Sequence, residues 1–358
     1  MKPPSIKDIA QSLGVSIGTV DRALHDRADV SAKTRTRVLK KSQQLGYRPN
    51  YAARALKLNR RLRIGVYFPQ QIASFFDPLR AGVQAAADSA MGVKVELVFR
   101  SFPSLGNGDK ELIVADSKQH FDGVLITPGN PKRLESVLNA WAQKGVAVVC
   151  VASDAPQSKR LACVTVDAYA SGAIAAELFS RTIRKAGSLA TMVGELSTLD
   201  HAEKLRGFAV TVATLAPHLE LLPTFESHEQ PEKAYQYARE LIAHKPRPRG
   251  IYLSTANSLP VLRAIREQDL IGKVQVIATD LFPDLIPCIE RGETLATLDQ
   301  RPYSQGKIAL NALLNYLMDG VVPPAITRLA PNIILRSNLQ LFTGSAAKNS
   351  DGQDHGED

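Results

Sequence analysis

The pattern of apolar and polar residues changes at about residue 63 of the chain. Beyond that point, short runs rich in Val, Ile and Leu alternate with longer segments in which apolar residues recur every three or four positions. The short runs predict buried strands, and the longer segments predict amphipathic helices. Such alternation predicts parallel sheets covered by helices, and its length favours two Rossmann-like halves over one sheet. Strands are expected at residues 63–68, 93–99, 123–127, 146–151, 163–166, 188–193, 250–254 and 274–279, and helices at residues 77–90, 109–119, 134–144, 170–184, 202–215, 259–268 and 283–291.

The N-terminal part has three short segments with helical spacing instead. Ser5, Ser16 and Ser31 stand in front of these segments as N-caps, and Gly14 ends the first. Two helices joined by a tight turn that contains glycine form a helix-turn-helix, although a generic helical hairpin shares this geometry. The three helices are expected at residues 6–13, 17–24 and 33–45.

Positive charge is concentrated in this N-terminal part. The chain of 358 residues has a formal net charge of +9. Residues 1–63 hold 15 Lys and Arg against 4 Asp and Glu, a charge of +11, which leaves −2 for the rest. A basic face confined to one small domain favours a polyanion as partner. Charge alone does not distinguish nucleic acid, acidic lipid and a solvated surface.

A short segment between the head and the body is a candidate switch. Asn50 is a good N-cap, and residues 51–58 contain neither Pro nor Gly, so they predict two turns of helix. Two turns are too short to be stable alone in water, so we expect this helix to form only when something packs against it. An ordinary linker helix is the alternative interpretation.

Composition and motifs exclude several classes of protein. No apolar run approaches the length of a bilayer span, and no signal-peptide core follows the first residues, so we expect a cytoplasmic protein. Cys150, Cys163 and Cys288 are expected to be buried free thiols, and no Cys–His spacing indicates a metal site. Glycine-rich nucleotide loops and nucleophile elbows are missing, so the sequence favours neither a cofactor nor an enzyme.

A nearly continuous set of motifs covers residues 5–58. It comprises Ile6–Ala10, Gly14–Ser16, Thr19–Val20, Arg22, Val30–Ser31, Thr34–Arg35, Val38–Leu39, Leu45–Asn50 and Ala52–Leu56. This set resembles the head of the lactose-repressor (LacI/GalR) family of bacterial transcription regulators. The resemblance implies a repressor that binds a palindromic DNA operator as a dimer and responds allosterically to a small-molecule effector.

The resemblance also implies which side chains contact DNA. The second helix would read bases in the major groove through the positions that match Ile17, Gly18 and Arg22. Arg22 can form a bidentate pair with guanine, which is worth about 1–3 kcal/mol of discrimination. Asp21 departs from the family, which usually has a Ser there that can donate to phosphate. Hydroxyl side chains expected to contact DNA, with helix capping as their other role, are Ser5, Ser16, Thr19, Ser31 and Thr34.

In the family, the hinge helices of two protomers pair over the minor groove. The residue that matches Leu56 wedges into the central base step, and small residues such as Ala53 allow the close approach. Asn50 belongs to the same expected set of DNA contacts. An effector that moves the two bodies apart would separate the helices and weaken binding.

The body resembles the periplasmic sugar-binding-protein fold. The resemblance rests on Ser74–Phe76 with Ala81–Ala86, His201–Phe208, Ala278–Asp280 and Leu298–Gly306. A sugar site needs planar polar groups for hydroxyl pairs and aromatic faces for the C–H surface. The implied effector contacts are Phe75, Phe76, Lys204, Asn257, Asp280 and Gln300.

Several alternatives remain at these positions. The two phenylalanines could be core residues, and Asp280 could cap the following helix. Lys204 replaces the usual Arg and lacks its rigid fork, and Ala152 and Ala73 replace polar residues of ribose-type sites. The effector is therefore expected to be a sugar or a sugar derivative that differs from a plain pentose. A purine-type corepressor and a cytoplasmic sugar sensor or enzyme are the alternatives.

The expected architecture is an α-helical head followed by an α/β body. Because the tail has no leucine heptad, we expect a dimer rather than a tetramer. The domains are expected at residues 1–48 (helix-turn-helix head), 49–62 (hinge helix and linker), 63–342 (effector-binding and dimerisation body) and 343–358 (disordered tail). Within the body, subdomain one is expected at about 63–166 plus 300–322, and subdomain two at about 167–299 plus 323–342.

Overall fold

A computed structural model describes residues 6–24, 30–45 and 61–344 of the chain. The head and the body are separate compact units, and each is considered by itself. The expected hinge helix, at residues 51–58, and the last fourteen residues of the expected tail lie outside the described residues.

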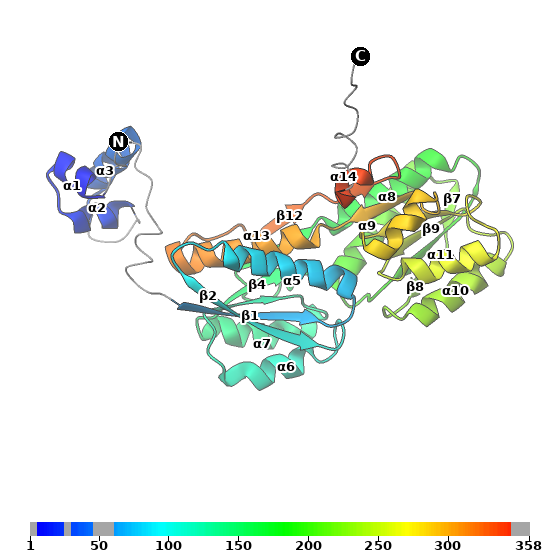
Figure 1. Cartoon of the computed structure of the whole chain (residues 1–358), viewed down its shortest axis with the longest axis horizontal. Helices are drawn as coiled ribbons and strands as arrows, with labels where there is room; N and C mark the ends of the chain where they lie inside the picture. Colours follow the sequence, from blue (N-terminus) through cyan, green and yellow to red (C-terminus); the bar gives the residue numbers. More distant parts are fainter. Residues whose placement is uncertain (1–5, 25–29, 46–60, 345–358) are drawn as a thin grey trace, which may run out of the picture. The chain divides into compact units, whose positions relative to one another are not determined.

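The head consists of the three expected helices, α1 (Ile6–Leu13), α2 (Ile17–Leu24) and α3 (Ala32–Gln44) (Figure 1). Their shared core contains Ile9, Val20 and Val38, each fully buried, and Leu24 and Leu45 pack at its edge. The helical spacing of apolar residues therefore predicted this small core correctly. The strands and helices of the body also alternate as expected.

The first lobe of the body is a six-stranded sheet between two layers of helices. Helices α6 and α7 lie on one face and α5 and α13 on the other (Figure 1). The sheet order is β12-β5-β4-β3-β1-β2. The strands are β1 (Arg61–Pro69), β2 (Lys94–Phe102), β3 (Gly123–Ile126), β4 (Ala147–Val151), β5 (Ala162–Val166) and β12 (Ile326–Leu329). The helices are α5 (Ala73–Asp88), α6 (Asp109–Ala115) with the 3-10 turn η1 (Asp116–Lys118), α7 (Pro131–Gln143) and α13 (Pro302–Asp319).

The second lobe has the same layered plan. Helices α8 and α9 cover one face of its sheet, and α10, α11 and α12 cover the other. The sheet order is β13-β11-β10-β9-β6-β7, and β8 pairs with β6. The strands are β6 (Gly187–Val193), β7 (Leu219–Leu221), β8 (Phe225–Glu226), β9 (Gly250–Ser254), β10 (Gln275–Thr279), β11 (Ala296–Asp299) and β13 (Asn332–Ile334). The helices are α8 (Ala168–Thr182), α9 (Leu199–Leu215), α10 (Pro231–Ala243), α11 (Ser258–Glu267), η2 (Pro283–Leu285), α12 (Ile286–Glu290) and α14 (Gln340–Thr343).

Each lobe holds a pair of helices in direct backbone contact at glycine. A Cβ on Gly82 of α5 would lie 2.0 Å from the carbonyl oxygen of Tyr303 on α13. A Cβ on Gly172 of α8 would lie 1.8 Å from the carbonyl oxygen of Lys204 on α9. Only glycine allows such close approach. The packing at Gly172 therefore fixes the helical turn that carries Lys204.

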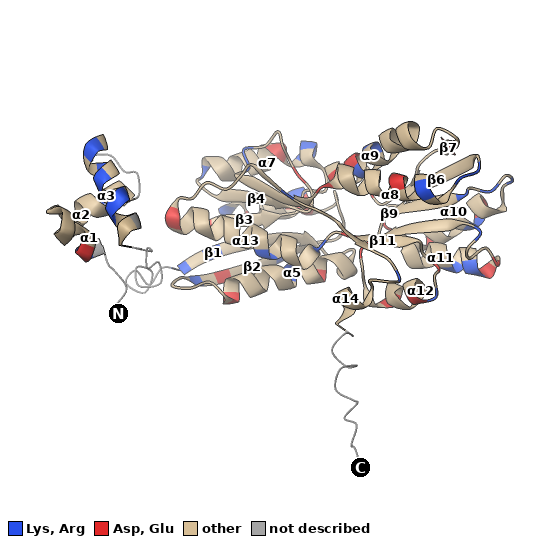
Figure 2. Ribbon diagram, turned by 90° about the horizontal axis from the view of Figure 1, so that it is seen from above, with Lys and Arg blue, Asp and Glu red and all other residues tan. Residues whose placement is uncertain are grey.

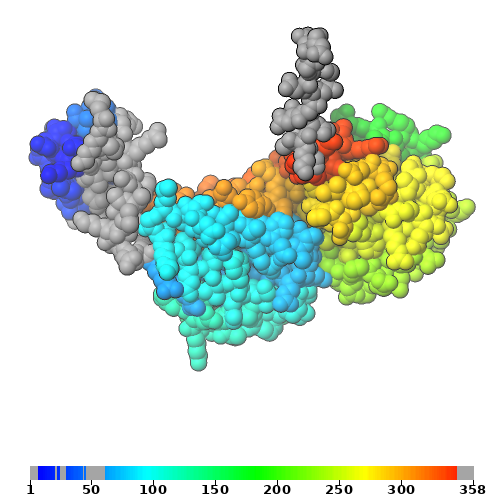
Figure 3. Space-filling model, viewed as in Figure 1, coloured from blue at the N-terminus to red at the C-terminus, as the bar shows by residue number. Residues whose placement is uncertain are grey.

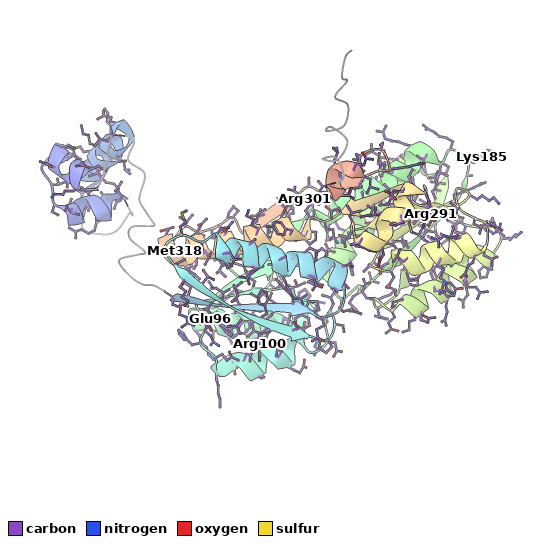
Figure 4. All side chains as sticks on the ribbon, viewed as in Figure 1. Glu96, Arg100, Lys185, Arg291, Arg301 and Met318 are labelled. Atoms are coloured by element: carbon purple, nitrogen blue, oxygen red, sulfur yellow. The ribbon has the colours of Figure 1, made fainter. Side chains whose placement is uncertain are left out.

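The chain passes between the lobes three times, after β5, after β11 and after β12. Arg301, labelled in Figure 4, lies at the second passage, directly before α13. Figure 3 shows the surface of the two lobes, cyan for the first and green to yellow for the second.

Two sequence-based expectations about the body were wrong. Residues 323–342 were assigned as a whole to the second subdomain, but β12 pairs in parallel with β5 of the first sheet. Only the part from β13 onward joins the second sheet. The helix expected from residue 77 begins at Ala73, because Phe75 and Phe76 are buried and belong to its first turn.

Candidate functional site

The head presents the start of α2 to solvent. Ser16, Ile17 and Gly18 are exposed, and Ile17 has 53% of its surface accessible although it is apolar. A Cβ on Gly18 would lie only 3.5 Å from Nη1 of Arg22, so the guanidinium of Arg22 lies over the glycine. The residue types expected to read bases therefore occupy one accessible stretch of one helix.

Hydroxyl groups cap both α2 and α3. Ser16 Oγ accepts a hydrogen bond from the backbone N–H of Thr19 at 3.0 Å, and Ser31 Oγ accepts one from that of Thr34 at 3.2 Å. The capping role is therefore confirmed for Ser16 and Ser31, and contact with phosphate stays a prediction. Four other expected DNA contacts, Ser5, Asn50, Ala53 and Leu56, lie outside the described residues.

Helix α3 carries much of the head's positive charge. Figure 2 shows Lys and Arg in blue along this helix. Its thirteen residues include five basic side chains and no acidic one. They are Lys33, Arg35, Arg37, Lys40 and Lys41.

The body contains a pocket between its two lobes, which we call the interlobe pocket. Its cavity volume is about 50 Å³, which is smaller than the roughly 300–1,000 Å³ of typical small-molecule sites, so a ligand enters only when the lobes separate. The pocket lies where loops follow the carboxyl ends of the strands, the usual place for ligands in α/β sheets. Its wall from the first lobe consists of Ile72, Phe75, Phe76, Leu105, Thr127, Ala152 and Ser153. Its wall from the second lobe consists of Thr198, Asp200, His201, Lys204, Glu229, Thr255, Ala256, Thr279, Asp280 and Gln300.

Five of the six expected effector contacts line this pocket. Phe75 and Phe76 contact each other edge to face, with ring centroids 5.0 Å apart. Lys204, Asp280 and Gln300 stand on the opposite wall. The sixth, Asn257, does not line the pocket and instead donates its amide N–H to Oε2 of Glu229 at 3.2 Å. It therefore orients a pocket residue.

Lys204 is the centre of a buried polar network. Its side chain is 1% exposed, and Nζ donates to Asp200 Oδ2 at 2.5 Å and to Gln300 Oε1 at 2.6 Å. The amide nitrogen of Gln300 in turn donates to both oxygens of Asp280, at 3.0 and 3.1 Å. Charge-assisted hydrogen bonds of this kind are stronger than neutral ones, so the network holds this wall rigidly.

Sequence reasoning missed the most unusual group of the pocket, Glu229. Its Oε2 accepts hydrogen bonds from the hydroxyl of Thr255, the backbone N–H of Ala256 and the amide of Asn257. Its Oε1 has no partner. Glu229 follows the two-residue strand β8 and a short turn, so no hydrophobic pattern marks its position.

Burial shifts the pKa values of three pocket residues. Desolvation raises the pKa of Glu229 to about 7 and that of Asp280 to about 7, because the charged carboxylates lose water. Desolvation, assisted by the charge of Lys204, lowers the pKa of His201 to about 4. His201, which the sequence marked only weakly, is buried in the pocket wall, whereas Tyr303 is 46% exposed and lies outside the pocket.

One other group has the residue types of a metal site. Ligand atoms of Glu195, Glu226 and His228 lie within 4.8 Å of one another. Glu195 Oε2 is 3.1 Å from Nδ1 of His228, and Glu226 accepts a hydrogen bond from the backbone N–H of Leu196. Each carboxylate thus already has a partner, and we assign no ion to this group. The three cysteines are buried and free, as expected.

Two bacterial regulators are similar to most of the chain. Catabolite control protein A of Priestia megaterium is 24% identical over 342 residues, which are 94% of this chain and 99% of the relative. The ribose operon repressor of Bacillus subtilis is 27% identical over 330 residues, which are 87% of this chain and 91% of the relative. No described helix has the length and apolar character needed to cross a membrane.

Solved structures resemble the body. A solute-binding protein of an ABC transporter from Burkholderia graminis, in complex with D-arabinose, has a TM-score of 0.72 and 24% identity. The similarity covers 78% of this chain and 97% of that protein, and it shows a shared fold.

Family profiles match both parts of the chain. The profile of periplasmic binding protein domains matches residues 64–320, which is more than half of the chain. The profile of bacterial regulatory proteins of the lacI family matches residues 5–50, which include the helix-turn-helix. The chain therefore belongs to the periplasmic binding protein domain family through its body, and it carries a DNA-binding domain of the lacI family of bacterial regulatory proteins at residues 5–50.

Proposed function

We propose that this protein is a DNA-binding transcription repressor controlled by a small molecule that binds in the interlobe pocket. The observation that carries the proposal is the presence, in one chain, of a helix-turn-helix with an exposed α2 start and a polar pocket between two lobes. The first feature suits recognition of a major groove, and the second suits a ligand that draws the lobes together.

In this proposal, α2 enters the major groove and Arg22 contacts a guanine. Ile17 offers only apolar contact, for example to a thymine methyl group. Gly18 has no side chain, so one base position of the half-site is read with little specificity. The hydroxyls of Ser16, Thr19, Ser31 and Thr34 fix the register on the phosphates, and Leu56 acts at the minor groove. The accessibility of the α2 start supports this assignment.

The proposed effector is a carbohydrate or a carbohydrate derivative. The ribose operon repressor among the relatives and the D-arabinose complex among the similar folds favour this class. The two phenylalanines opposite planar polar groups suit a ring with an apolar face. A purine that promotes DNA binding is the second candidate, and a ligand screen separates the two.

We further propose a homodimer that binds a palindromic operator in the cytoplasm and catalyses no reaction. A dimer would present two heads to the two half-sites of the operator. The relatives support a regulatory role, since they are named as a control protein and a repressor rather than as enzymes.

Selection of random DNA by the full-length protein tests the DNA-binding half. Arg22→Ala should lose about 1–3 kcal/mol of discrimination and relax the preference at one base position of each half-site. Arg37→Ala on α3 is the matched control, because it removes an exposed positive charge outside α2. It should weaken binding uniformly and keep the sequence preference. Equal preferences in both variants would contradict the assignment of Arg22.

A thermal-shift screen of sugars, polyols and nucleobases tests the effector half. A ligand that binds the native state raises the melting temperature. A sugar that stabilises the wild type but neither Asp280→Ala nor Gln300→Ala would support the pocket as its site. Stabilisation by purines alone would support the corepressor function instead.

A further inference from the structure

The interlobe pocket contains more acidic groups than basic ones. Asp200, Glu229 and Asp280 line it, and Lys204 is the one formal cation among the lining residues, all of which the structure describes. With the carboxyl groups ionised, the lining has a net charge of −2. Uncompensated charge in a buried site is unfavourable, so the ligand must be compatible with this surplus.

The hydrogen bonds show which carboxylate lacks compensation. Asp200 pairs directly with Lys204, and Asp280 is connected to Lys204 through Gln300. Glu229 receives hydrogen bonds only from neutral groups, those of Thr255, Ala256 and Asn257. No cation of the pocket lining therefore contacts Glu229.

Glu229 is nevertheless held in place as part of a built site. It is 8% exposed, and three donors converge on its Oε2. A Cβ on Gly194 would lie 1.7 Å from Oε1, so the carboxylate occupies space that only glycine leaves free. Oε1 is buried without any hydrogen-bond partner, and the Glu229 side chain lines the pocket. Desolvation raises the pKa of Glu229 to about 7 against the opposing effect of the hydrogen bonds to Oε2, so a nearby cation would favour the ionised carboxylate.

The opposite wall adds aromatic faces. Phe75 and Phe76 come from α5 of the first lobe and are both nearly fully buried. Aromatic faces attract cations as well as C–H surfaces of sugars. An organic ligand with a positively charged group thus finds a favourable partner on each wall.

We propose that the effector carries a protonated amine, as in an amino sugar or an aminopolyol, and that this ammonium group pairs with the carboxylate of Glu229. The inference rests on the proposed function, because it takes the interlobe pocket as the effector site. The hydroxyl groups of the same ligand meet Asp280, Gln300 and the unpartnered hydroxyls of Thr127 and Ser153. Phosphorylated or carboxylated ligands are disfavoured, because they add negative charge to an acidic pocket.

Matched pairs of ligands test the proposal with the full-length protein. The probes are D-glucosamine against D-glucose, D-galactosamine against D-galactose, and 1-amino-1-deoxysorbitol against sorbitol. The pH is 7, at which the amines are largely protonated and Glu229, with a pKa of about 7, is about half ionised. Calorimetry measures the affinity, and thermal shift gives a second readout. At least one amine should bind about tenfold or more tightly than its hydroxyl counterpart.

Two variants test whether Glu229 causes the preference for the amine ligand. Glu229→Gln keeps the shape of the side chain and should reduce the amine-to-hydroxyl affinity ratio to about one. Glu220→Gln changes the net charge equally at an exposed site on β7 and should leave the ratio unchanged. If Glu229→Gln does not fold, the amine-to-hydroxyl affinity ratio of the wild type still tests the proposal.

Three outcomes would overturn the proposal. They are a hydroxyl compound that binds as tightly as its amine, an amine preference that survives Glu229→Gln, and failure of every amine probe to bind. Tight binding of a neutral sugar would refute the amine and leave the proposed function intact. Failure of the proposed function would instead appear as absence of selected DNA sequences.

Discussion

The two lobes of the body share one construction but offer different walls to the pocket. Each has a parallel sheet core between helices and a pair of helices in contact at glycine. The first lobe contributes mainly apolar residues such as Phe75 and Phe76, whereas the second contributes Lys204, Glu229 and Asp280. The common scaffold therefore sets where a ligand binds, and the residues on the scaffold set its chemistry.

This contrast predicts unequal consequences of mutation on the two walls. A change on the second lobe's wall should alter electrostatics and stability together. A change on the first lobe's wall should alter only packing.

Lys204→Met should have the largest effect. It leaves Asp200 without its cation and removes the link to Gln300 and Asp280 in a buried network. Removing one partner of a buried pair costs about 3–5 kcal/mol of unfolding free energy. Urea unfolding of the full-length protein measures this value. A loss below about 1 kcal/mol would show that the network does not hold the wall together.

Glu229→Gln should stabilise the protein at high pH. Burial raises the pKa of Glu229 from 4.5 to about 7, so the folded state holds the proton more tightly than the unfolded state. The Glu229 contribution to stability is full below pH 4.5 and is lost as the pH rises to about 7. Above pH 7 the variant should exceed the wild type by up to about 3 kcal/mol, and at pH 4.5 the two should be equal.

Other titratable groups near Glu229 also change the stability of the protein with pH. The variant must therefore be compared with the wild type at each pH. Asp280, with its pKa raised to about 7, acts in the same direction, and His201, with its pKa lowered to about 4, acts in the opposite one. Asp200 and Lys204 also face this region. The difference between variant and wild type, measured by thermal unfolding at several pH values, isolates Glu229. A difference that does not vary between pH 4.5 and 8 would contradict the assigned burial effect.

Phe76→Leu should have the smallest effect. It exchanges one buried apolar side chain for another and costs less than about 1.5 kcal/mol of unfolding free energy. The ligand should bind more weakly through loss of the aromatic face, with no change in the pH dependence of stability. Urea unfolding and calorimetry measure the two quantities. A changed pH dependence would mean that the first lobe's wall also contributes to the electrostatics.

Much of this picture is predictable from the sequence, for a physical reason. The apolar spacing that defined α2 also fixed the head's core, and strand ends marked Asp280. The resemblance to binding proteins identified the phenylalanines, Lys204 and Gln300. These residues lie in regular elements or directly after them, where local patterns are strong.

The failures have physical reasons as well. Glu229 lies in a turn after β8, and its role depends on β8 pairing with β6 and on space left by Gly194. The return of β12 to the first sheet depends on pairing with β5, which is about 160 residues earlier in the chain. Such long-range pairings leave no periodic signal in the local sequence.

We propose above that a ligand in the interlobe pocket controls DNA binding by the head. Fluorescence anisotropy with a selected DNA sequence, with and without a ligand that stabilises the protein, tests it most directly. We expect ligand to change the DNA affinity of the wild type by about tenfold or more and to leave that of Lys204→Met unchanged. An equal DNA affinity of the wild type at zero and at saturating ligand would contradict it.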